Sequence, residues 1–408
     1  MTNQMEKIVH ERKRCGKENH IIHTIPENNY IMNIPRILIV TGEASGDLHG
    51  AHLIRAVKQR LPQAQIFGVG GAHLAAEGVT LISSSDELAV VGVTEVIKKL
   101  KTVYAVFKKL SRFLKEERPD LLILVDYPDF NLRLAKVART LGIRVVYYIS
   151  PQVWAWRSSR VKLIQKIITK MIVIFPFERE FYQRHGVDVE WVGHPLVETV
   201  KSSLTKAEFC QQHAFDPSKP LLGLLPGSRE SEIERLLPLM LETAWRIREQ
   251  QSETQFLLPV ASSLSQSSFF AALPEWIKPI HQQTYEAIAA ADVVMTASGT
   301  VTVETTLLET PMLITYIVSP LTFWIGYFFI KVRRIGMVNL IAGKEVAKEF
   351  IQKHATPDAV AQEALRLLRD SEAREAIRRE LHAVRQQLGE PGAADRAAKV
   401  IVDTLSKL

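Results

Sequence analysis

The segment Arg36–Thr41, with the sequence RILIVT, runs directly into the turn Gly42-Glu43-Ala44-Ser45-Gly46-Asp47. The segment is an apolar run of strand length, and the turn leads into an amphipathic pattern over Leu48–Leu61, which predicts a strand, a turn and a helix. A near-continuous apolar run at Leu121–Val125 predicts a strand covered on both faces, as in a parallel sheet. This alternation predicts a doubly wound α/β fold.

The same alternation continues along the chain and then starts again after a link at 193–206. Further strands are expected at Gln65–Val69, Val145–Ile149, Met171–Phe175, Leu221–Leu225, Gln255–Val260, Val293–Thr296 and Met312–Tyr316. We therefore expect two Rossmann-like domains, 34–195 and 196–370, facing a central cleft. The helical tail 371–408 is expected to pack back on the first domain. The polar segment 1–33 has no apolar signal core and is interpreted as a disordered extension or a start-site artefact.

The bulk composition is that of a globular chain. A length of 408 residues suits two domains. Hydrophobic residues make up 47% and charged residues 23%, which excludes a disordered or fibrous class. The cysteines, Cys15 and Cys210, are too few for a disulfide framework or a cysteine metal site, and this suits a reducing cytoplasm.

The excess of positive charge is concentrated. The net charge is +7, and the segment 98–118 is rich in Lys and Arg. Over 95–118 apolar residues recur at helical spacing opposite the lysines, which suits either an anionic membrane surface or a core-facing helix with a solvated basic side. The apolar segment Leu321–Ile330 is followed by Lys331, Arg333 and Arg334. It is too short to span a bilayer, so it is interpreted as a buried helix or a lipid interface.

Candidate functional residues are those just after the strands, because ligands of open α/β sheets bind beyond the carboxyl ends of the strands. Asp126 and Asp129 follow Leu121–Val125 in one turn. A carboxylate there is placed to take a proton from a sugar hydroxyl, although Asp and Pro are also ordinary turn residues. Asp126 is the preferred base and Asp129 its rival. The turn 42–47 suits contact with phosphate or sugar oxygens, or is a tight turn with Asp47 as a helix N-cap.

The second half of the chain has two helix starts that suit phosphate. In Pro226-Gly227-Ser228-Arg229, a glycine turn, a hydroxyl and a guanidinium coincide, and Arg229 is placed to stabilise charge on a departing nucleotide. The turn Ser298-Gly299-Thr300 opens a helix that carries Glu304. Glu304 is placed to accept ribose hydroxyls, or is simply favourable near a helix N-terminus.

Metal chemistry is not indicated by the sequence. No Asp-x-Asp, His-Glu-x-x-His or Cys-x-x-Cys motif occurs, and His194 in the link is expected to be a structural hydrogen bonder. A diphosphate leaving group would then depend on Arg229 and the two helix starts for positive charge.

Several motifs in one order resemble the bacterial lipid-A-disaccharide synthase family over nearly all of 34–408. The resemblance is carried by GEASGD (42–47), DYPDFN (126–131), YYISPQVWAWR (147–157), LLPGSRESEI (from 224), ASGTVTVE (297–304), PLTFW (320–324) and VNLIAGKEVAKE (338–349).

The resemblance implies a GT-B fold and an inverting glycosyl transfer without a metal or cofactor. The donor would be UDP-diacylglucosamine and the acceptor diacylglucosamine phosphate, called lipid X. It further implies that Asp126 and Arg229 are essential and that Asn339 lies near the nucleotide. The residues implied to form the UDP-binding region are Gly227, Ser228, Ser298, Gly299, Thr300 and Glu304.

The expected setting is the cytoplasmic face of the inner membrane, with peripheral attachment to its anionic surface and no nucleic-acid partner. A monomer and a homodimer both stay open. One alternative is another enzyme of this architecture, such as a UDP-sugar epimerase or a lipid-linked N-acetylglucosaminyltransferase. The other is a non-catalytic protein that binds anionic surfaces.

Overall fold

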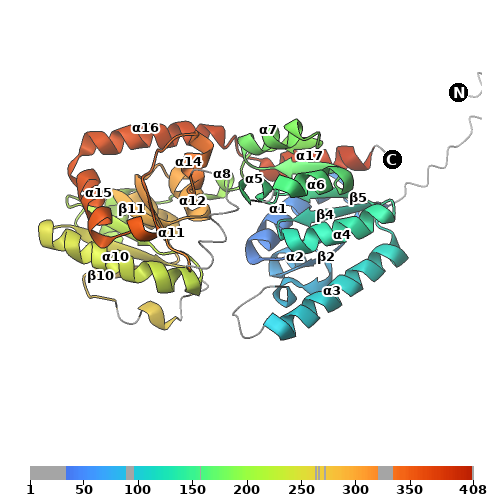
Figure 1. The fold of residues 1–408 in the computed structure, drawn as a ribbon, viewed down its shortest axis with the longest axis horizontal. Coiled ribbons are helices and arrows are strands. Elements are labelled where there is room, and N and C mark those ends of the chain that lie inside the picture. Colours follow the sequence, from blue (N-terminus) through green and yellow to red (C-terminus); the bar gives the residue numbers. More distant parts are fainter. Residues whose placement is uncertain are drawn as a thin grey trace, which may run out of the picture. The chain divides into compact units, whose positions relative to one another are not determined.

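The computed structural model describes residues 34–88, 96–156, 158–261, 264, 267–270, 273–319 and 334–406. These residues form two α/β units, each built on a parallel sheet, seen in Figure 1 in blue to green and in yellow to orange. The predicted α/β class with two Rossmann-like halves is confirmed. The segments 1–33 and Leu321–Ile330, and the motif PLTFW, lie outside the described residues.

The first sheet has seven strands in the order β3-β2-β1-β4-β5-β6-β7. Its strands are β1 (Arg36–Thr41), β2 (Gln65–Gly70), β3 (Thr80–Ser84), β4 (Leu121–Val125), β5 (Arg144–Tyr148), β6 (Lys170–Val173) and β7 (Val189–Trp191). The helices of this half are α1 (Ala44–Arg60), α2 (Ala72–Ala76), α3 (Val96–Glu117), α4 (Pro128–Thr140), α5 (Val153–Trp156), α6 (Val161–Ile167) and α7 (Pro176–Arg184). The central strands β1 and β4 are fully buried from Ile37 and Leu121 onward, as two covered faces require.

The second sheet has six strands in the order β10-β9-β8-β11-β12-β13. Its strands are β8 (Leu221–Leu225), β9 (Gln255–Val260), β10 (Ile277–His281), β11 (Val293–Ala297), β12 (Met312–Tyr316) and β13 (Glu349–Ile351). The accompanying helices are α8 (Leu196–Thr199), α9 (Lys206–Gln212), α10 (Glu230–Gln250), α11 (Thr284–Ala290), α12 (Thr300–Leu307), α14 (Met337–Ala342) and α15 (Pro357–Arg369). Both sheets therefore reverse their strand order at one central point, between β1 and β4 and between β8 and β11.

The strands that the sequence did not predict are those with mixed or short patterns. β3, β7, β10 and β13 have the sequences TLISS, VEW, IKPIH and EFI. Each lies near or at a sheet edge, where one neighbour is missing and a continuous apolar run is not needed. Helix α1 begins at Ala44, four residues before the expected start at Leu48, because Glu43 takes the extended N-cap conformation.

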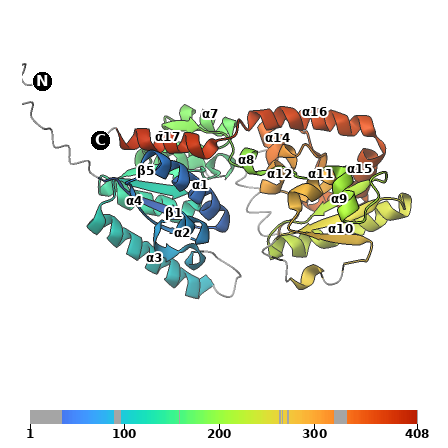
Figure 2. The ribbon, with the colours of Figure 1, turned by 180° about the vertical axis from the view of Figure 1, so that it is seen from behind.

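The helical tail divides between the two halves of the chain. The last helix, α17 (Ala393–Leu405), packs on α1, and Figures 1 and 2 show the two helices side by side. The preceding helix, α16 (Ser371–Gln387), packs instead on α12, α14 and α15. The expectation that the whole of 371–408 returns to the first domain is therefore corrected: α17 does so, whereas α16 packs on helices of the second half.

The basic helix α3 uses its apolar face in the core of the first half. Val106, Leu110 and Leu114 are buried, and the helix packs on α4. Tyr104 was expected on this face but is 67% exposed. For side chains 101–117 the core-facing interpretation is therefore correct. The basic side chains of the helix remain exposed at Lys101, Lys108, Lys109, Arg112 and Lys115.

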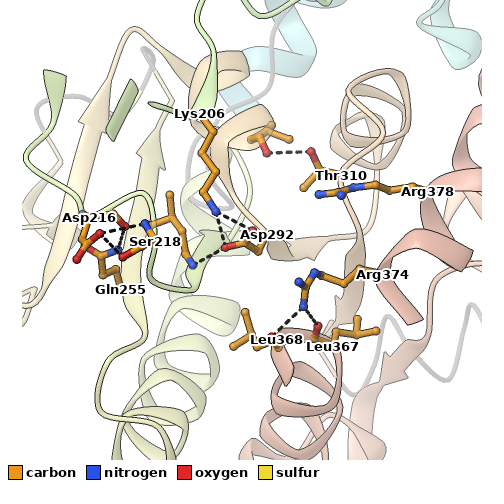
Figure 3. Close-up of polar contacts among 12 residues, drawn as sticks. Lys206, Asp216, Ser218, Gln255, Asp292, Thr310, Leu367, Leu368, Arg374 and Arg378 are labelled. Atoms are coloured by element: carbon orange, nitrogen blue, oxygen red, sulfur yellow. Dashed lines mark hydrogen bonds and ion pairs between the residues drawn. The ribbon is translucent and has the colours of Figure 1, made fainter. Parts of the chain in front are cut away.

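Ion pairs and hydrogen bonds hold the amino ends of the central strands in the second sheet. The ammonium of Lys206 contacts both carboxylate oxygens of Asp292 at 2.7 and 2.8 Å, and the Leu221 N–H donates to the same carboxylate at 2.8 Å (Figure 3). Asp292 therefore links the amino-terminal ends of β8 and β11. The opposite, carboxyl ends of these strands carry the turns that the sequence singles out.

Candidate functional site

The turns predicted to carry function follow the central strands of both sheets. Gly42-Glu43 follows β1 and Asp126-Tyr127 follows β4, on either side of the point where the strand order reverses. In the second sheet, Gly227–Arg229 follows β8 and Ser298–Thr300 follows β11. In open α/β sheets this point of reversal is where ligands bind.

Asp126 stands at the carboxyl end of β4 with its backbone in the left-handed region, at a φ of 47°. Burial is the largest cause that raises the pKa of its carboxyl, and the nearby Glu43 carboxylate raises that pKa further. The guanidinium of Arg229 acts in the opposite direction. A carboxylate with a raised pKa is a better proton acceptor at neutral pH than an exposed one.

Arg229, from the other half of the chain, lies within electrostatic reach of Asp126. Its guanidinium is 3.7 Å from a Glu43 carboxylate oxygen and 3.5 Å from one of Glu232. Its side chain is 69% exposed, so these pairs contribute little stability and leave the guanidinium open to a ligand. The structure therefore places Arg229, from the turn after β8, beside Glu43 in the turn after β1 and within electrostatic reach of Asp126.

The turn Gly227-Ser228 contains a glycine at a positive φ and a backbone N–H that donates to a carboxylate. Gly227 has a φ of 116°, and a Cβ there would lie 2.3 Å from a Glu232 carboxylate oxygen. The Ser228 N–H donates to the same carboxylate at 3.1 Å. A carboxylate oxygen thus already accepts a hydrogen bond from this turn, as a phosphate oxygen would.

The turn Ser298-Gly299-Thr300 opens helix α12. The Ser298 hydroxyl donates to the carbonyl of Ile335 at 3.2 Å, and Thr300 is exposed. One turn further, Glu304 accepts a hydrogen bond from the Tyr285 hydroxyl at 3.2 Å, and burial raises the pKa of its carboxyl. Tyr285 was not singled out in the sequence, because nothing in its local pattern marks it.

Asn339 is not exposed to a ligand in this structure. It is fully buried, and its side-chain amide donates to the Ala347 carbonyl at 2.6 Å and to Glu349 at 2.8 Å. Its side-chain oxygen accepts from the N–H groups of Val346 and Ala347 at 2.7 and 2.9 Å. The Asn339 side chain therefore supports the loop before β13, and its place near the nucleotide stays a prediction.

Glu349 is a site-supporting residue that the sequence did not single out. Its carboxylate accepts hydrogen bonds from the N–H groups of Ile335 and Gly336 at 3.0 and 2.9 Å, besides the Asn339 amide. Because Ser298 bonds the Ile335 carbonyl, Glu349 and Asn339 fix the segment that contacts the turn after β11.

Asp129 and His194, the other two residues discussed for the first half and the link, have partners of their own. Asp129 is exposed in the first turn of α4 and pairs with Arg160. His194 is buried, its Nδ1 accepts from the Leu196 N–H at 3.2 Å, and its ring packs on Phe175. The preference for Asp126 over Asp129 as the base stays a prediction, whereas the structural interpretation of His194 is confirmed.

The aspartate of the first turn has an unexpected role. Asp47 lies inside α1 and is buried, and its carboxylate accepts from the N–H groups of Gly71, His73 and Leu74 at 2.6, 3.0 and 3.3 Å. It therefore caps α2, not α1 as the alternative interpretation held. Asp47 holds the turn after β2 against the turn after β1.

A buried glutamate that the sequence did not single out lies after β6. Glu178 is 2% exposed, and its carboxylate accepts from the Ser150 hydroxyl at 2.6 Å, the Trp154 indole N–H at 3.1 Å and the Phe175 N–H at 3.2 Å. It connects the loop after β5 to the end of β6. Burial raises the pKa of this carboxyl to about 7 despite these hydrogen bonds.

In the described part of the chain, no cluster of three or more His, Cys, Asp or Glu side chains is arranged to hold a metal ion. None of the helices described there combines the length and the apolar character needed to cross a membrane.

The chain has clear relatives. The family model described as "Lipid-A-disaccharide synthetase" matches residues 37–402. The lipid-A-disaccharide synthase of Nitrosococcus oceani is 46% identical over 374 residues, which is 91% of this chain and 96% of the relative. That of Geobacter metallireducens is 44% identical over 375 residues, covering 91% and 98%.

Solved structures share the fold at low identity. The Staphylococcus aureus MnaA–UDP structure has a TM-score of 0.62 at 12% identity and covers 92% of this chain and 98% of its own. Acinetobacter baumannii MurG has a TM-score of 0.54 at 14% identity, covering 92% and 100%. These likenesses support the two-domain GT-B architecture, and the sequence matches place the chain in the lipid-A-disaccharide synthase family.

Proposed function

We propose that the chain transfers diacylglucosamine from UDP-diacylglucosamine to lipid X, giving the acylated disaccharide phosphate and UDP. The observation that carries this proposal is that Arg229, after β8, lies 3.7 Å from Glu43, after β1, and within electrostatic reach of Asp126, after β4. These turns lie where the strand orders of the two sheets reverse. Family membership supports the choice of substrates, and the arrangement of the turns supports the proposed roles of the side chains.

In the proposed reaction, Asp126 takes the proton of the acceptor's primary hydroxyl. The oxygen of that hydroxyl forms the new bond to the donor's anomeric carbon. At the same time the bond from this carbon to the UDP oxygen breaks, so the configuration at the carbon inverts. UDP leaves with the electron pair of the broken bond, and the guanidinium of Arg229 stabilises its negative charge.

The second half would hold the nucleotide. The turn with Gly227 and Ser228 and the turn Ser298–Thr300 offer backbone N–H groups at helix starts for the phosphates. Glu304, paired with Tyr285, is placed one turn inside α12, where its carboxylate would accept ribose hydroxyls.

The proposed location is the cytoplasmic face of the inner membrane, where acylated substrates lie. The exposed basic side chains of α3 support attraction to an anionic surface, since each cation near such a surface contributes about 1 kcal/mol. A variant with Lys108→Glu and Lys115→Glu should sediment less with anionic vesicles, while neutral vesicles serve as the control. A monomer and a homodimer both stay open, and light scattering of the purified protein decides between them.

The main test compares two carboxylates of one turn. Purified wild type, Asp126→Asn and Asp129→Asn are mixed with both acylated sugars in the presence of a chelator, and disaccharide phosphate and UDP are measured. We expect Asp126→Asn to lose at least about 100-fold in rate, the usual contribution of a positioned base. Asp129→Asn should stay near wild type. Full activity of Asp126→Asn would remove the base from the proposal, and epimerised UDP-acetylglucosamine from a parallel incubation would favour the epimerase alternative.

A further inference from the structure

Two consecutive non-glycine residues at the carboxyl end of β4 have left-handed backbones. Asp126 has a φ of 47° and Tyr127 a φ of 48°. This conformation is disfavoured for residues with a side chain, because Cβ approaches the following carbonyl oxygen. It persists only where the surrounding contacts enforce it, and such places gather at functional sites.

The carbonyl oxygen of Asp126 accepts hydrogen bonds from two buried side chains. One donor is the hydroxyl of Tyr147 on β5, and the other is the side-chain amide of Asn131 on α4, at 2.7 Å. The same amide also lies 3.2 Å from the Val125 carbonyl. Tyr147 and Asn131 are both fully buried, so water does not compete for these bonds.

Tyr127 is held by contacts on either side of the turn. Its carbonyl accepts from the Asn131 N–H at 3.1 Å, and its hydroxyl donates to the Leu88 carbonyl at 3.1 Å. Its ring fills the space at Gly42, where a Cβ would lie 2.3 Å from the ring. The turn after β4 is thus locked against the turn after β1.

Packing alone does not explain why position 131 is an asparagine. Its side-chain oxygen is buried and has no hydrogen-bond partner among the described residues. An unsatisfied buried oxygen is destabilising, and an apolar side chain of similar size would avoid it. The useful group of Asn131 is therefore its side-chain N–H, which donates to the carbonyl oxygens of Val125 and Asp126.

We infer that Asn131 and Tyr147 are positioning residues, which hold Asp126 in its left-handed conformation and so aim its carboxylate at the acceptor hydroxyl. This inference rests on the proposed function, in which Asp126 is the base. A left-handed φ turns the Cα–Cβ bond away from the direction that an extended strand would give it. Without the two donors, the turn relaxes and the carboxylate moves from the position where it meets the hydroxyl.

The test uses two neighbouring tyrosines as a matched pair. Tyr147 and Tyr148 are both fully buried on β5, but the hydroxyl of Tyr148 has no hydrogen-bond partner among the described residues. Tyr147→Phe should lower kcat between about tenfold and about a hundredfold, the usual range for a misplaced catalytic group, with KM little changed. Tyr148→Phe should leave kcat unchanged. Asn131→Leu should reproduce the loss seen in Tyr147→Phe.

A pH profile and a double variant separate positioning from a merely structural effect. Released from its buried position, Asp126 should titrate at lower pH, so the acid limb of kcat/KM should move down in Tyr147→Phe. In an Asp126→Asn background, Tyr147→Phe should cause no further loss, because no base remains to be aimed.

The outcomes distinguish the role of Asp126 as the base from the positioning role of Tyr147 and Asn131. If Asp126→Asn is inactive while Tyr147→Phe keeps the wild-type kcat and pH profile, the positioning role is overturned. Equal losses of kcat in Tyr147→Phe and Tyr148→Phe would also overturn it. If Asp126→Asn is fully active, the base assignment itself fails. The tyrosine pair decides the question even where Asn131→Leu does not fold.

Discussion

Glu178 gives a prediction about stability that the structure makes quantitative. The substitution Glu178→Gln keeps the size of the side chain and an oxygen acceptor for Ser150 and Trp154, and removes the titratable group. In the native protein, burial raises the pKa of this carboxyl from 4.5 to about 7. The carboxylate is only 2% exposed, so solvent screening does not reduce the effect.

The direction in which the free energy of unfolding changes with pH follows from proton binding to Glu178. Between 4.5 and about 7 the folded protein keeps the proton that the unfolded chain has released. The free energy of unfolding is therefore highest below the unfolded pKa and falls as the pH rises through the folded pKa. At about 1.4 kcal/mol per pKa unit, the whole fall is about 3 kcal/mol.

The assay is urea unfolding of wild type and Glu178→Gln at a series of pH values between about pH 5 and about pH 8, where the linkage acts. We expect the free energy of unfolding of wild type, relative to Glu178→Gln, to fall by most of the 3 kcal/mol worked out above. Glu208→Gln is the matched control, because Glu208 also caps its own helix start from the N3 position but is exposed. The pKa of Glu208 is lowered by its hydrogen bonds to Thr205, so its stabilising effect is lost only at more acidic pH.

A relative free energy of unfolding that stays constant over this pH range would refute the reasoning. It would mean that Glu178 is ionised in the folded protein at every pH tested, and that its hydrogen bonds to Ser150, Trp154 and Phe175 outweigh the effect of burial.

Two further substitutions test the nucleotide turn and the tail. Gly227→Ala should weaken UDP binding at least about tenfold in calorimetry, because its Cβ would meet Glu232 and its φ is 116°. Gly142→Ala, also at a positive φ, of 78°, but free of close contacts, should bind UDP as wild type does. Ile401 is fully buried in α17, so Ile401→Ala should lower the free energy of unfolding by about 3 kcal/mol. An unchanged midpoint of urea unfolding would show that α17 does not contribute to folding. As a control, Lys399→Ala, at an exposed position of the same helix, should change the free energy of unfolding by no more than about 0.5 kcal/mol.

The sequence by itself determined the fold class and pointed to the turns of the candidate site. Apolar runs such as Leu121–Val125 are strands because a parallel sheet buries both faces, and this pattern is local. Once the strands are known, the residues after them must lie at one edge of the sheet, which is how Asp126 and Arg229 were singled out. The motifs in their order indicated the family, which the comparisons confirmed.

Only the tertiary structure decided what those residues contact. The side chain of Asn339 is bonded within its own loop, and Asp47 caps α2 through N–H groups that lie 24 and 26 residues further along the chain. No local pattern reveals the hydrogen-bonding roles of Glu178 and Tyr147, because these roles depend on partners that the sheet brings near. Periodicity reports which face of an element is buried. The hydrogen-bond partners of a buried polar group are set by packing between distant segments, and no local pattern records them.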